Sequence, residues 1–218
     1  MEKNDDRKRV SRKFAAEAVI LADGDYPTHA VPRNVLNEAQ MVACCDGAVD
    51  AFVARGGVPH LIVGDGDSIS EENRERFASI MVKVSEQETN DLTKTVKQLL
   101  QRGVKRIAIV GATGKREDHT LGNISLLLEY KRMGADVRMY TDYGVFVAVN
   151  DDAVFESFAR QQVSIFNFGA KGLSAEGLEY PLSDFTSWWQ GSLNQSSGDE
   201  FVIHAQGEYI TFLTHEAK

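Results

Sequence analysis

The sequence predicts an α/β amino-terminal domain with a mostly parallel sheet, followed by a smaller all-β domain. Three observations lead to this prediction. Short apolar runs alternate with helical patterns in the first part of the chain. After about residue 136 the apolar segments resemble strands joined by polar or glycine-rich turns, with no long helix between them. A chain of 218 residues, 43% of them hydrophobic, can also bury a sizeable core.

Five apolar runs are expected to form the strands of the first domain: residues 18–23, 41–46, 60–65, 80–85 and 106–111. Between and after them lie segments with apolar residues three and four positions apart, which is the spacing of an amphipathic helix. These helical segments are residues 47–57, 71–78, 90–103 and 118–134. The alternation indicates β/α units around a parallel sheet.

The second domain is expected to hold strands near residues 145–150, 162–168, 200–207 and 208–215, and the segment 136–142 also has a strand pattern. We expect the domain boundary to fall between residues 143 and 153. The predicted organisation is therefore a flexible tail at 1–14, an α/β domain at 15–145 and an all-β domain at 146–218.

The charge and composition argue against several classes of function. The formal net charge of -8 disfavours a nonspecific nucleic-acid surface, because phosphate backbones need clustered Lys and Arg. The charged start and the short apolar segment after it do not match a signal peptide or a membrane span. The adjacent Cys44 and Cys45 should point to opposite faces of a strand and remain unpaired, which suits a reducing cytosol. We therefore expect a cytoplasmic protein that binds neither nucleic acid nor membrane.

Three of the apolar runs end in an aspartate followed by glycine, namely Asp23, Asp46 and Asp65. In an open parallel sheet the ligand crevice lies at the carboxyl ends of the strands, so these side chains should converge on one edge. Asp67 adds another carboxylate. An Asp-Gly pair also makes a good turn, but three pairs at successive strand ends favour a site. Carboxylates suit Mg²⁺ carrying substrate phosphates, whereas the His and Cys residues show no zinc-ligand spacing.

The helical segment that starts near Asn90 brings further charges to this edge. Asp91 lies in its first turn, and Lys94 follows three residues later on the same face. A helix amino terminus tolerates both acids and phosphates because of its dipole. The structural alternative is that Asn90 or Thr89 serves only as a helix cap.

A basic loop follows the fifth strand, in GATGKREDHTLGN at residues 111–123. Its glycines make backbone amides accessible, Lys115 and Arg116 add cationic donors, and Asp118 and His119 open the next helix. Amides together with an Arg fork suit a polyphosphate, although the spacing is not that of a Walker loop. The alternative is a charged, solvated loop. Together with the aspartates, the loop predicts a site for Mg²⁺ and a nucleotide polyphosphate.

The order of these motifs resembles the thiamin pyrophosphokinase family. DGA at 46–48, GDGDS at 64–68, QETNDLTK at 87–94 and GATGKREDH at 111–119 are similar to the family motifs DGG, GDxDS, QxxTDxxK and GxxGxRxDH. GLEYPL at 177–182 and GSLNQ at 191–195 also resemble family segments. The resemblance spans roughly residues 18–212, and it is the ordered set of motifs that makes it specific.

The resemblance implies an α/β domain that binds ATP and Mg²⁺, an all-β sandwich domain, and a homodimer that binds thiamin between its subunits. It implies transfer of the diphosphoryl group of ATP to thiamin, which yields thiamin diphosphate and AMP. By motif position it implies catalytic roles for Asp67, Asp91, Arg116 and Asp118, and metal ligands at Asp46, Asp65, Asp67 and Asp91. It implies ATP contacts at Asp46, Gly47, Gln87, Lys94, Thr113, Gly114, Lys115, Arg116 and His119, and thiamin contacts at Trp188, Trp189, Ser192 and Asn194.

The chain departs from the family motifs at five positions: Ala48, Asn90, Lys115, Leu193 and Gln195. The changes at Leu193 and Gln195 remove a hydroxyl and a carboxylate from the loop matched to thiamin binding. These changes leave open a non-catalytic nucleotide or thiamin sensor. A metal-dependent phosphohydrolase is also open, because it would use the same carboxylates with water as the nucleophile. Within the kinase hypothesis, the base that accepts the alcohol proton is either Asp67 or Asp91.

Overall fold

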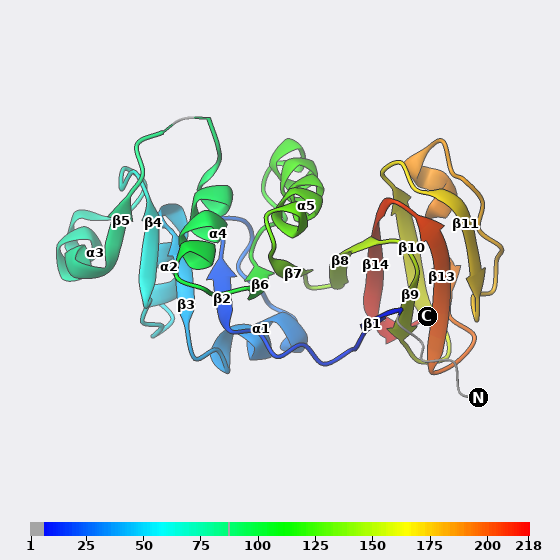
Figure 1. Cartoon of the computed structure of the whole chain (residues 1–218). Coiled ribbons are helices and arrows are strands. Elements are labelled where there is room, and N and C mark those ends of the chain that lie inside the picture. The colour runs from blue at the N-terminus through cyan, green and yellow to red at the C-terminus, as the bar shows by residue number, and fades with distance from the viewer. Residues whose placement is uncertain (1–6, 87) are drawn as a thin grey trace. The chain divides into compact units, whose positions relative to one another are not determined.

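The computed structural model describes residues 7–86 and 88–218, which form two compact units (Figure 1). The α/β unit comprises residues 15–142, and the β unit comprises residues 7–14 together with 143–218. The division therefore falls between residues 142 and 143, close to the boundary expected from the sequence. The order of an α/β unit before a β-rich unit confirms the predicted fold class.

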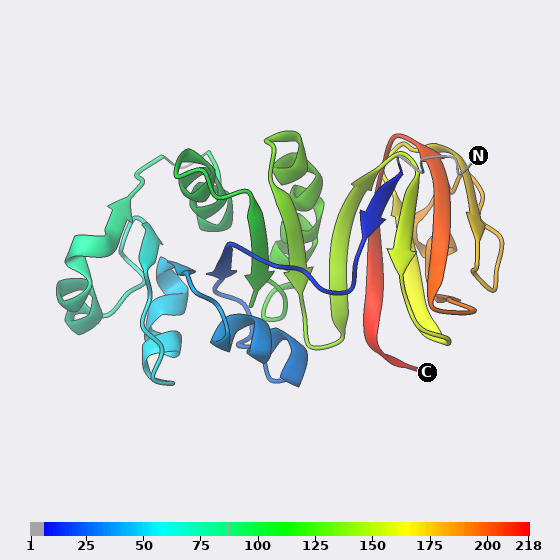
Figure 2. The same cartoon turned by 60° about the horizontal axis from the view of Figure 1, so that its bottom comes forward.

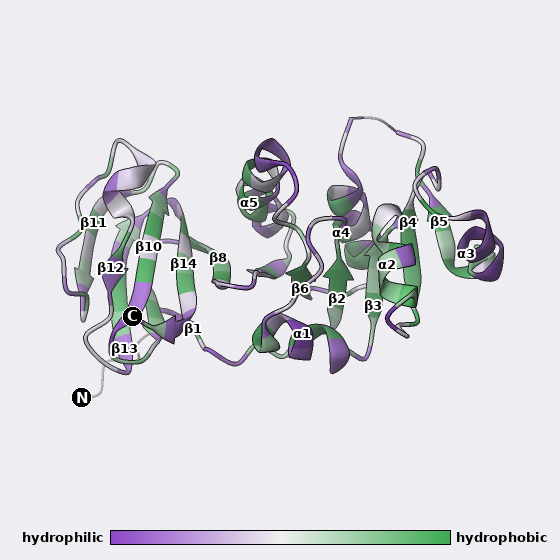
Figure 3. Ribbon diagram, turned by 180° about the vertical axis from the view of Figure 1, so that it is seen from behind, coloured by the Kyte–Doolittle hydropathy of each residue, from purple (hydrophilic) through white to green (hydrophobic). Residues whose placement is uncertain are grey.

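Six parallel strands form the sheet of the α/β unit, in the order β7-β6-β2-β3-β4-β5. The strands are β2 (Ala18–Leu21), β3 (Val42–Cys45), β4 (Leu61–Gly64), β5 (Met81–Lys83), β6 (Arg106–Val110) and β7 (Asp136–Tyr140). Every residue of β2, β3 and β4 is buried. Figure 3 shows these strands as hydrophobic along their length, as expected of parallel strands covered on both faces.

Helices cover both faces of this sheet, with α4 and α5 on one side and α1 and α2 on the other (Figure 2). The helices are α1 (Ala30–Asn37), α2 (Val49–Val53), α3 (Glu71–Arg76), α4 (Asp91–Gln101) and α5 (Glu117–Arg132), with short 3₁₀ turns η1 (Asp46–Ala48) and η2 (Ala78–Ile80). No helix in the described residues is both long enough and apolar enough to cross a membrane. The helices begin at the carboxyl ends of the strands, which leaves their first turns at one edge of the sheet.

Helix α1 was not expected from the sequence. It begins after His29, whose Nδ1 accepts a hydrogen bond from the Val31 amide at 3.2 Å. Pro32 lies in its first turn, where backbone N–H groups have no acceptor within the helix, so the missing N–H of proline breaks no helical hydrogen bond. The proline-containing segment hides the helical pattern, although the helix buries Leu36 as an amphipathic helix would.

The β unit consists of two four-stranded arrays, β12-β10-β14-β8 and β1-β9-β13-β11. The strands are β1 (Lys8–Val10), β8 (Gly144–Asn150), β9 (Ala153–Glu156), β10 (Gln161–Asn167), β11 (Lys171–Glu176), β12 (Asn194–Gln195), β13 (Glu200–Gln206) and β14 (Glu208–Ala217). Both arrays contribute to one buried cluster that includes Val147, Val163, Phe155 and Phe201. The rings of Phe155 and Phe201 stack with their centroids 4.8 Å apart. This shared core makes the unit a β-sandwich.

Strand β1 corrects part of the flexible tail predicted for residues 1–14, of which residues 1–6 lie outside the described residues. Lys8–Val10 pairs in parallel with β9, and Val10 is buried in the sandwich core. Ser11 donates a hydrogen bond of 2.6 Å to Glu156, and Arg9 forms an ion pair of 3.2 Å with Glu200. These contacts join residues far apart in the chain, so the local sequence pattern does not indicate them.

His204 on β13 makes the stability of the β unit depend on pH. Its Nε2 lies 3.0 Å from Glu176 Oε1 and its Nδ1 lies 3.2 Å from Asp152 Oδ2. Hydrogen bonding to Glu176, and to a smaller extent to Asp152, raises the pKa of His204 above its ordinary value. The resulting stabilisation is fully present below the unfolded-state pKa of about 6.5 and is lost as the pH rises through the folded-state pKa.

We therefore expect the β unit to become less stable as the pH rises above about 6.5. Urea unfolding followed by tryptophan fluorescence measures this change, because the two tryptophans of the chain, Trp188 and Trp189, both lie in the β unit. His204→Gln should flatten this part of the stability profile. An identical pH slope in the variant and the parent would contradict the assignment to His204.

Candidate active site

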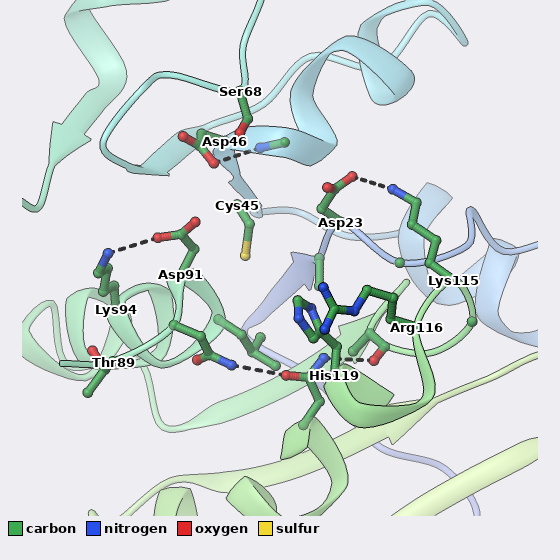
Figure 4. A pocket seen from close by; sticks show the side chains of 18 of the residues that line it. Asp23, Cys45, Asp46, Ser68, Thr89, Asp91, Lys94, Lys115, Arg116 and His119 are labelled. Atoms are coloured by element: carbon green, nitrogen blue, oxygen red, sulfur yellow. Dashed lines mark hydrogen bonds and ion pairs between the residues drawn. The ribbon is translucent and has the colours of Figure 1, made fainter. Parts of the chain in front are cut away.

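A cavity of about 450 Å³ opens at the carboxyl ends of β2, β3, β4 and β6. Asp23, Asp46 and Asp65 follow the first three of these strands, and all three line the cavity. The loop after β6 and the first turn of α4 supply cations to the same cavity (Figure 4). The convergence expected from the three strand-end aspartates is therefore present in the structure.

Asp46, Asp65 and Asp67 form a cluster in which one oxygen from each residue lies within 4.8 Å of the others. Asp46 is only 3% exposed, and its two oxygens accept hydrogen bonds from the amides of Gly47 at 2.7 Å and Gly66 at 2.9 Å. Burial raises the pKa of Asp46, whereas a hydrogen bond from the Asp67 amide lowers the pKa of Asp65. Three hard oxygen donors at this spacing fit a cation such as Mg²⁺.

Glycines allow the strand-end carboxylates to pack against the neighbouring backbone. A Cβ atom on Gly64, the last residue of β4, would lie 2.5 Å from Asp46 Cγ. A Cβ atom on Gly47 would lie 2.7 Å from Asp23 Oδ2. Glycines that look like simple turn or strand-end residues in the sequence are thus positions where a carboxylate from the neighbouring strand approaches the backbone.

Gly64→Ala is expected to destabilise the α/β unit by about 1–3 kcal/mol, since the added methyl group overlaps Asp46 in a packed interior. The same displacement should weaken binding of Mg²⁺ to the carboxylate cluster. Thermal unfolding measures the first effect, and titration with Mn²⁺ followed by electron paramagnetic resonance measures the second. Gly56→Ala provides a contrast, because no atom lies within 4 Å of its added Cβ although its φ of +84° carries backbone strain. Unchanged metal binding in Gly64→Ala would contradict the steric argument.

Asp50 on α2 holds the loop that carries Asp65 and Asp67. Its carboxylate accepts hydrogen bonds from the Ser70 amide at 2.9 Å, from the Ser70 hydroxyl at 2.7 Å and from the Asn73 side chain at 2.6 Å. Partial burial acts to raise the pKa of Asp50, but these hydrogen bonds outweigh burial and leave the pKa lowered. Asp50 therefore connects the segment after Asp46 to the far end of the acidic loop, a contact that the sequence analysis did not identify.

Helix α4 contributes an acid and a buried cation to the lining of the cavity. The Lys94 side chain is only 4% exposed, and its Nζ lies 3.0 Å from Asp91 Oδ1. Burial lowers the pKa of Lys94, but the hydrogen bond and charge of Asp91 outweigh burial and leave it raised. Lys94 is therefore a protonated, buried cation at the cavity wall.

Two asparagines join the walls formed by α4 and α5. Asn90 caps α4 by accepting a hydrogen bond from the Thr93 amide at 2.9 Å, and its Nδ2 donates to Asn123 Oδ1 at 3.1 Å. Asn123 in turn donates to the Ala112 carbonyl at 2.8 Å. Asn90 thus acts both as the cap expected from the sequence and as part of the cavity wall.

The loop after β6 contributes two exposed cations. Lys115 has a left-handed backbone with φ of 52°, and its Nζ forms an ion pair of 2.8 Å with Asp23. The Arg116 guanidinium forms two hydrogen bonds with Asp118, at 3.1 and 2.5 Å, and the pairing lowers the pKa of Asp118. The positive φ of Lys115 is a backbone conformation that glycine adopts more readily than residues with a side chain.

The structure brings most of the sequence-predicted ATP and metal residues into one cavity. Its walls include Asp46, Gly47, Asp65, Asp91, Lys94, Gly114, Lys115, Arg116 and His119. Asp67 belongs to the carboxylate cluster, whereas Thr113 and Asp118 are not among the lining residues, and Gln87 lies outside the described residues. Sequence reasoning did not single out Cys45, Ser68 and Asn123, which also line the cavity.

The residues matched to thiamin binding lie in the β unit, around the 3₁₀ turn η3 (Trp188–Gly191). Trp188 is 46% exposed and Trp189 is 75% exposed. The Ser192 hydroxyl donates a hydrogen bond to the Trp189 carbonyl at 2.6 Å. Asn194 is buried, and its side chain bonds the Tyr180 amide and carbonyl at 3.1 and 2.8 Å. Asn194 therefore secures the loop, while the tryptophans present aromatic surface to solvent.

Comparison with known proteins identifies both units. The family model described as the thiamin pyrophosphokinase catalytic domain matches residues 32–139, and the model of the thiamin pyrophosphokinase substrate-binding domain matches residues 144–212. Thiamin pyrophosphokinase 1 of Caenorhabditis elegans is 30% identical over 126 residues, covering 53% of this chain and 51% of the relative. Thiamine pyrophosphokinase of Bacillus subtilis is 34% identical over 126 residues, covering 55% of this chain and 58% of the relative. These matches span about half the length of the curated relatives.

Solved structures share the fold over nearly the whole chain. A thiamine pyrophosphokinase structure from Bacillus subtilis has a TM-score of 0.75 at 20% identity, covering 90% of this chain and 98% of the other. A structure of thiamin pyrophosphokinase from Candida albicans has a TM-score of 0.78 at 16% identity, covering 96% and 93% of the two chains. Because the two family models together match both units, the chain belongs to the thiamin pyrophosphokinase family.

Proposed function

We propose that this protein transfers the diphosphoryl group of ATP to thiamin and releases thiamin diphosphate and AMP. The observation that carries the proposal is the cavity of the α/β unit, where the cluster of Asp46, Asp65 and Asp67 shares one site with Lys94 and Arg116. Phosphoryl transfer requires carboxylates that hold a metal ion and cations that bind phosphates, and this cavity contains both. Membership of the family supplies the substrates of the proposal.

In this proposal Asp46, Asp65 and Asp67 hold Mg²⁺, and Lys94 and Arg116 orient the phosphates. Once bound, Mg²⁺ would offset negative charge on the phosphate oxygens. The buried Lys94 supplies a fixed positive charge from the cavity wall, and the exposed Arg116 supplies a planar fork that matches phosphate oxygens. These residues contribute mainly position and charge, which account for most of the catalysis in phosphoryl transfer.

Asp91 is proposed to accept the proton of the thiamin hydroxyl. It lines the cavity but lies outside the carboxylate cluster that contains Asp67. Lys94 binds its Oδ1, and Oδ2 forms no hydrogen bond with another described residue. The hydroxyl oxygen would attack the β-phosphorus, the bond from that phosphorus to the α,β-bridging oxygen would break, and AMP would leave. This assignment gives Asp67 to the metal and Asp91 to the proton.

The thiamin-binding part of the proposal rests on the β unit. Trp188 and Trp189 expose aromatic surface on which a thiamin ring can stack, and Ser192 and Asn194 shape the adjoining loop. We propose further that the protein acts as a cytoplasmic homodimer. Sedimentation analysis tests the dimer independently of activity.

The test is incubation of the purified protein with ATP, Mg²⁺ and thiamin, followed by chromatography that resolves AMP, ADP and thiamin diphosphate. Equal amounts of AMP and thiamin diphosphate, formed only when thiamin is present, are expected. ADP in place of AMP would show transfer of a single phosphoryl group and overturn the proposed reaction. Thiamin-independent release of phosphate would favour a phosphohydrolase, and ligand binding without any product would favour a sensor.

A further inference from the structure

A second cavity of about 490 Å³ lies in the α/β unit, on the face covered by α1 and α2. It is lined by Tyr26, Pro27, Thr28, Arg33, Leu36, Asn37 and Arg55. None of these residues lines the candidate active site. The volume lies within the range of sites for small molecules.

Two arginines, Arg33 and Arg55, line this cavity together with the phenol of Tyr26. The guanidinium carbon of Arg55 lies 4.1 Å from the centroid of the Tyr26 ring. Burial raises the pKa of Tyr26, although the positive charges of Arg55 and Arg33 both act to lower it. Both cations are therefore close enough to influence the hydroxyl, which keeps its proton and remains a hydrogen-bond donor.

Neither arginine has a carboxylate partner in the part of the chain that the structure describes. Arg55 donates a hydrogen bond to the Ala51 carbonyl at 2.8 Å, and no ion pair within residues 7–86 and 88–218 involves Arg33. Other arginines of this chain, such as Arg106 and Arg132, pair with glutamates. Among the described residues, no Asp or Glu lines the cavity. Two uncompensated cations thus face one cavity in a protein whose net charge is -8.

We propose that this cavity binds a phosphate group, as inorganic phosphate or as part of a small phosphomonoester. Arg33 and Arg55 offer planar forks that match phosphate oxygens, and the Tyr26 hydroxyl and the Asn37 amide offer further donors. Leu36 is buried and forms an apolar wall beside these donors. The proposed site is separate from the one assigned to ATP and does not depend on the reaction assigned there.

One loop connects the two cavities. Asp23 and Gly24 line the active-site cavity, and Tyr26 and Thr28 line the second one. The Thr28 amide also donates to Asp142 at 2.9 Å, which secures the far end of the loop. A phosphate held at Tyr26 therefore contacts the same short segment that positions Asp23.

The test is calorimetric titration of inorganic phosphate, and separately of AMP, into the full-length, metal-free protein at low ionic strength. Removing one charge-assisted partner weakens binding by about tenfold or more, so the double variant Arg33→Gln/Arg55→Gln should bind phosphate about 100-fold more weakly. Arg76→Gln is the matched control, because Arg76 also stacks on an aromatic ring, that of Phe77, but does not line the cavity. Its phosphate affinity should equal that of the parent.

Two further variants show whether phosphate occupies this cavity and whether the arginine charges hold it there. Arg116→Gln, in the active-site cavity, should retain phosphate binding if the ligand occupies the second cavity. Arg33→Lys/Arg55→Lys keeps both charges and should recover part of the affinity, which distinguishes lost charge from misfolding. Equal affinity for both ligands would identify inorganic phosphate as sufficient. AMP binding that is tighter than phosphate binding and is also lost in the double Gln variant would identify a phosphomonoester, because AMP can occupy the active-site cavity as well. Parent-like affinity in the double Gln variant, loss of binding in Arg116→Gln, or no binding to the parent at millimolar phosphate would overturn the proposal.

Discussion

Asp46→Asn is expected to lower the rate of AMP formation by about 100-fold or more, because the substitution removes a buried charge from the carboxylate cluster. Both oxygens of Asp46 accept hydrogen bonds from backbone amides, those of Gly47 and Gly66. An asparagine amide group would turn an NH₂ toward one of these N–H donors and leave that amide unpaired. The cluster would then lose both negative charge and its fixed geometry.

Steady-state kinetics at several Mg²⁺ concentrations measures this effect, and thermal unfolding shows whether the variant remains folded. Glu72→Gln is the control, since Glu72 lies on the exposed surface of α3 and is not a member of the carboxylate cluster. We expect the control to retain the parent rate. An Asp46→Asn enzyme with full activity at the same Mg²⁺ concentration would remove Asp46 from the proposed metal site.

Arg116→Gln is expected to lower kcat by about 100-fold or more, since an arginine that stabilises a transferring phosphoryl group often contributes at least this much. The fold should be almost unaffected. The Arg116 and Asp118 side chains are 71% and 60% exposed, and pairs this exposed contribute little to stability. A large loss of turnover with an unchanged melting temperature is the expected combination.

The matched control lies on the helix that follows Arg116. Arg132 forms an exposed ion pair of 3.2 Å with Glu129 near the other end of α5, away from the active-site cavity, so Arg132→Gln should keep the parent kcat. Arg116→Lys retains the charge but not the two-pronged contact, and its kcat should fall between those of the parent and Arg116→Gln. Equal rates for all three variants would show that Arg116 does not contact the transferred group.

The core of the fold is predictable from the sequence because its signals are local. The fully buried strands β2, β3 and β4 appear as short apolar runs, and α4 begins at its asparagine cap. Local sequence patterns do not predict two of the elements, α1 and β1. The prolines around α1 obscure its helical pattern, and β1 is held by contacts with Glu156 and Glu200 that sequence spacing does not reveal.

In the candidate site, too, some side-chain positions follow from local sequence and others depend on tertiary contacts. Asp46, Asp65 and Lys94 are predictable, because the end of a strand or the first turn of a helix determines where each side chain lies. Asp50 is not predictable, since its partner Ser70 follows 20 residues later on another element. The orientation of Asp118 is likewise a tertiary property, because its carboxylate turns to Arg116 and does not line the cavity.

The spacing of the acidic cluster has a consequence for folding as well as for the proposed metal site. Three carboxylates whose oxygens lie within 4.8 Å of one another repel when all are ionised, and one of them, Asp46, is almost completely buried. A cation that binds the folded cluster but not the unfolded chain stabilises the folded state in proportion to the logarithm of its concentration. With the proposed metal site, the stability of the α/β unit is therefore expected to rise with divalent-cation activity.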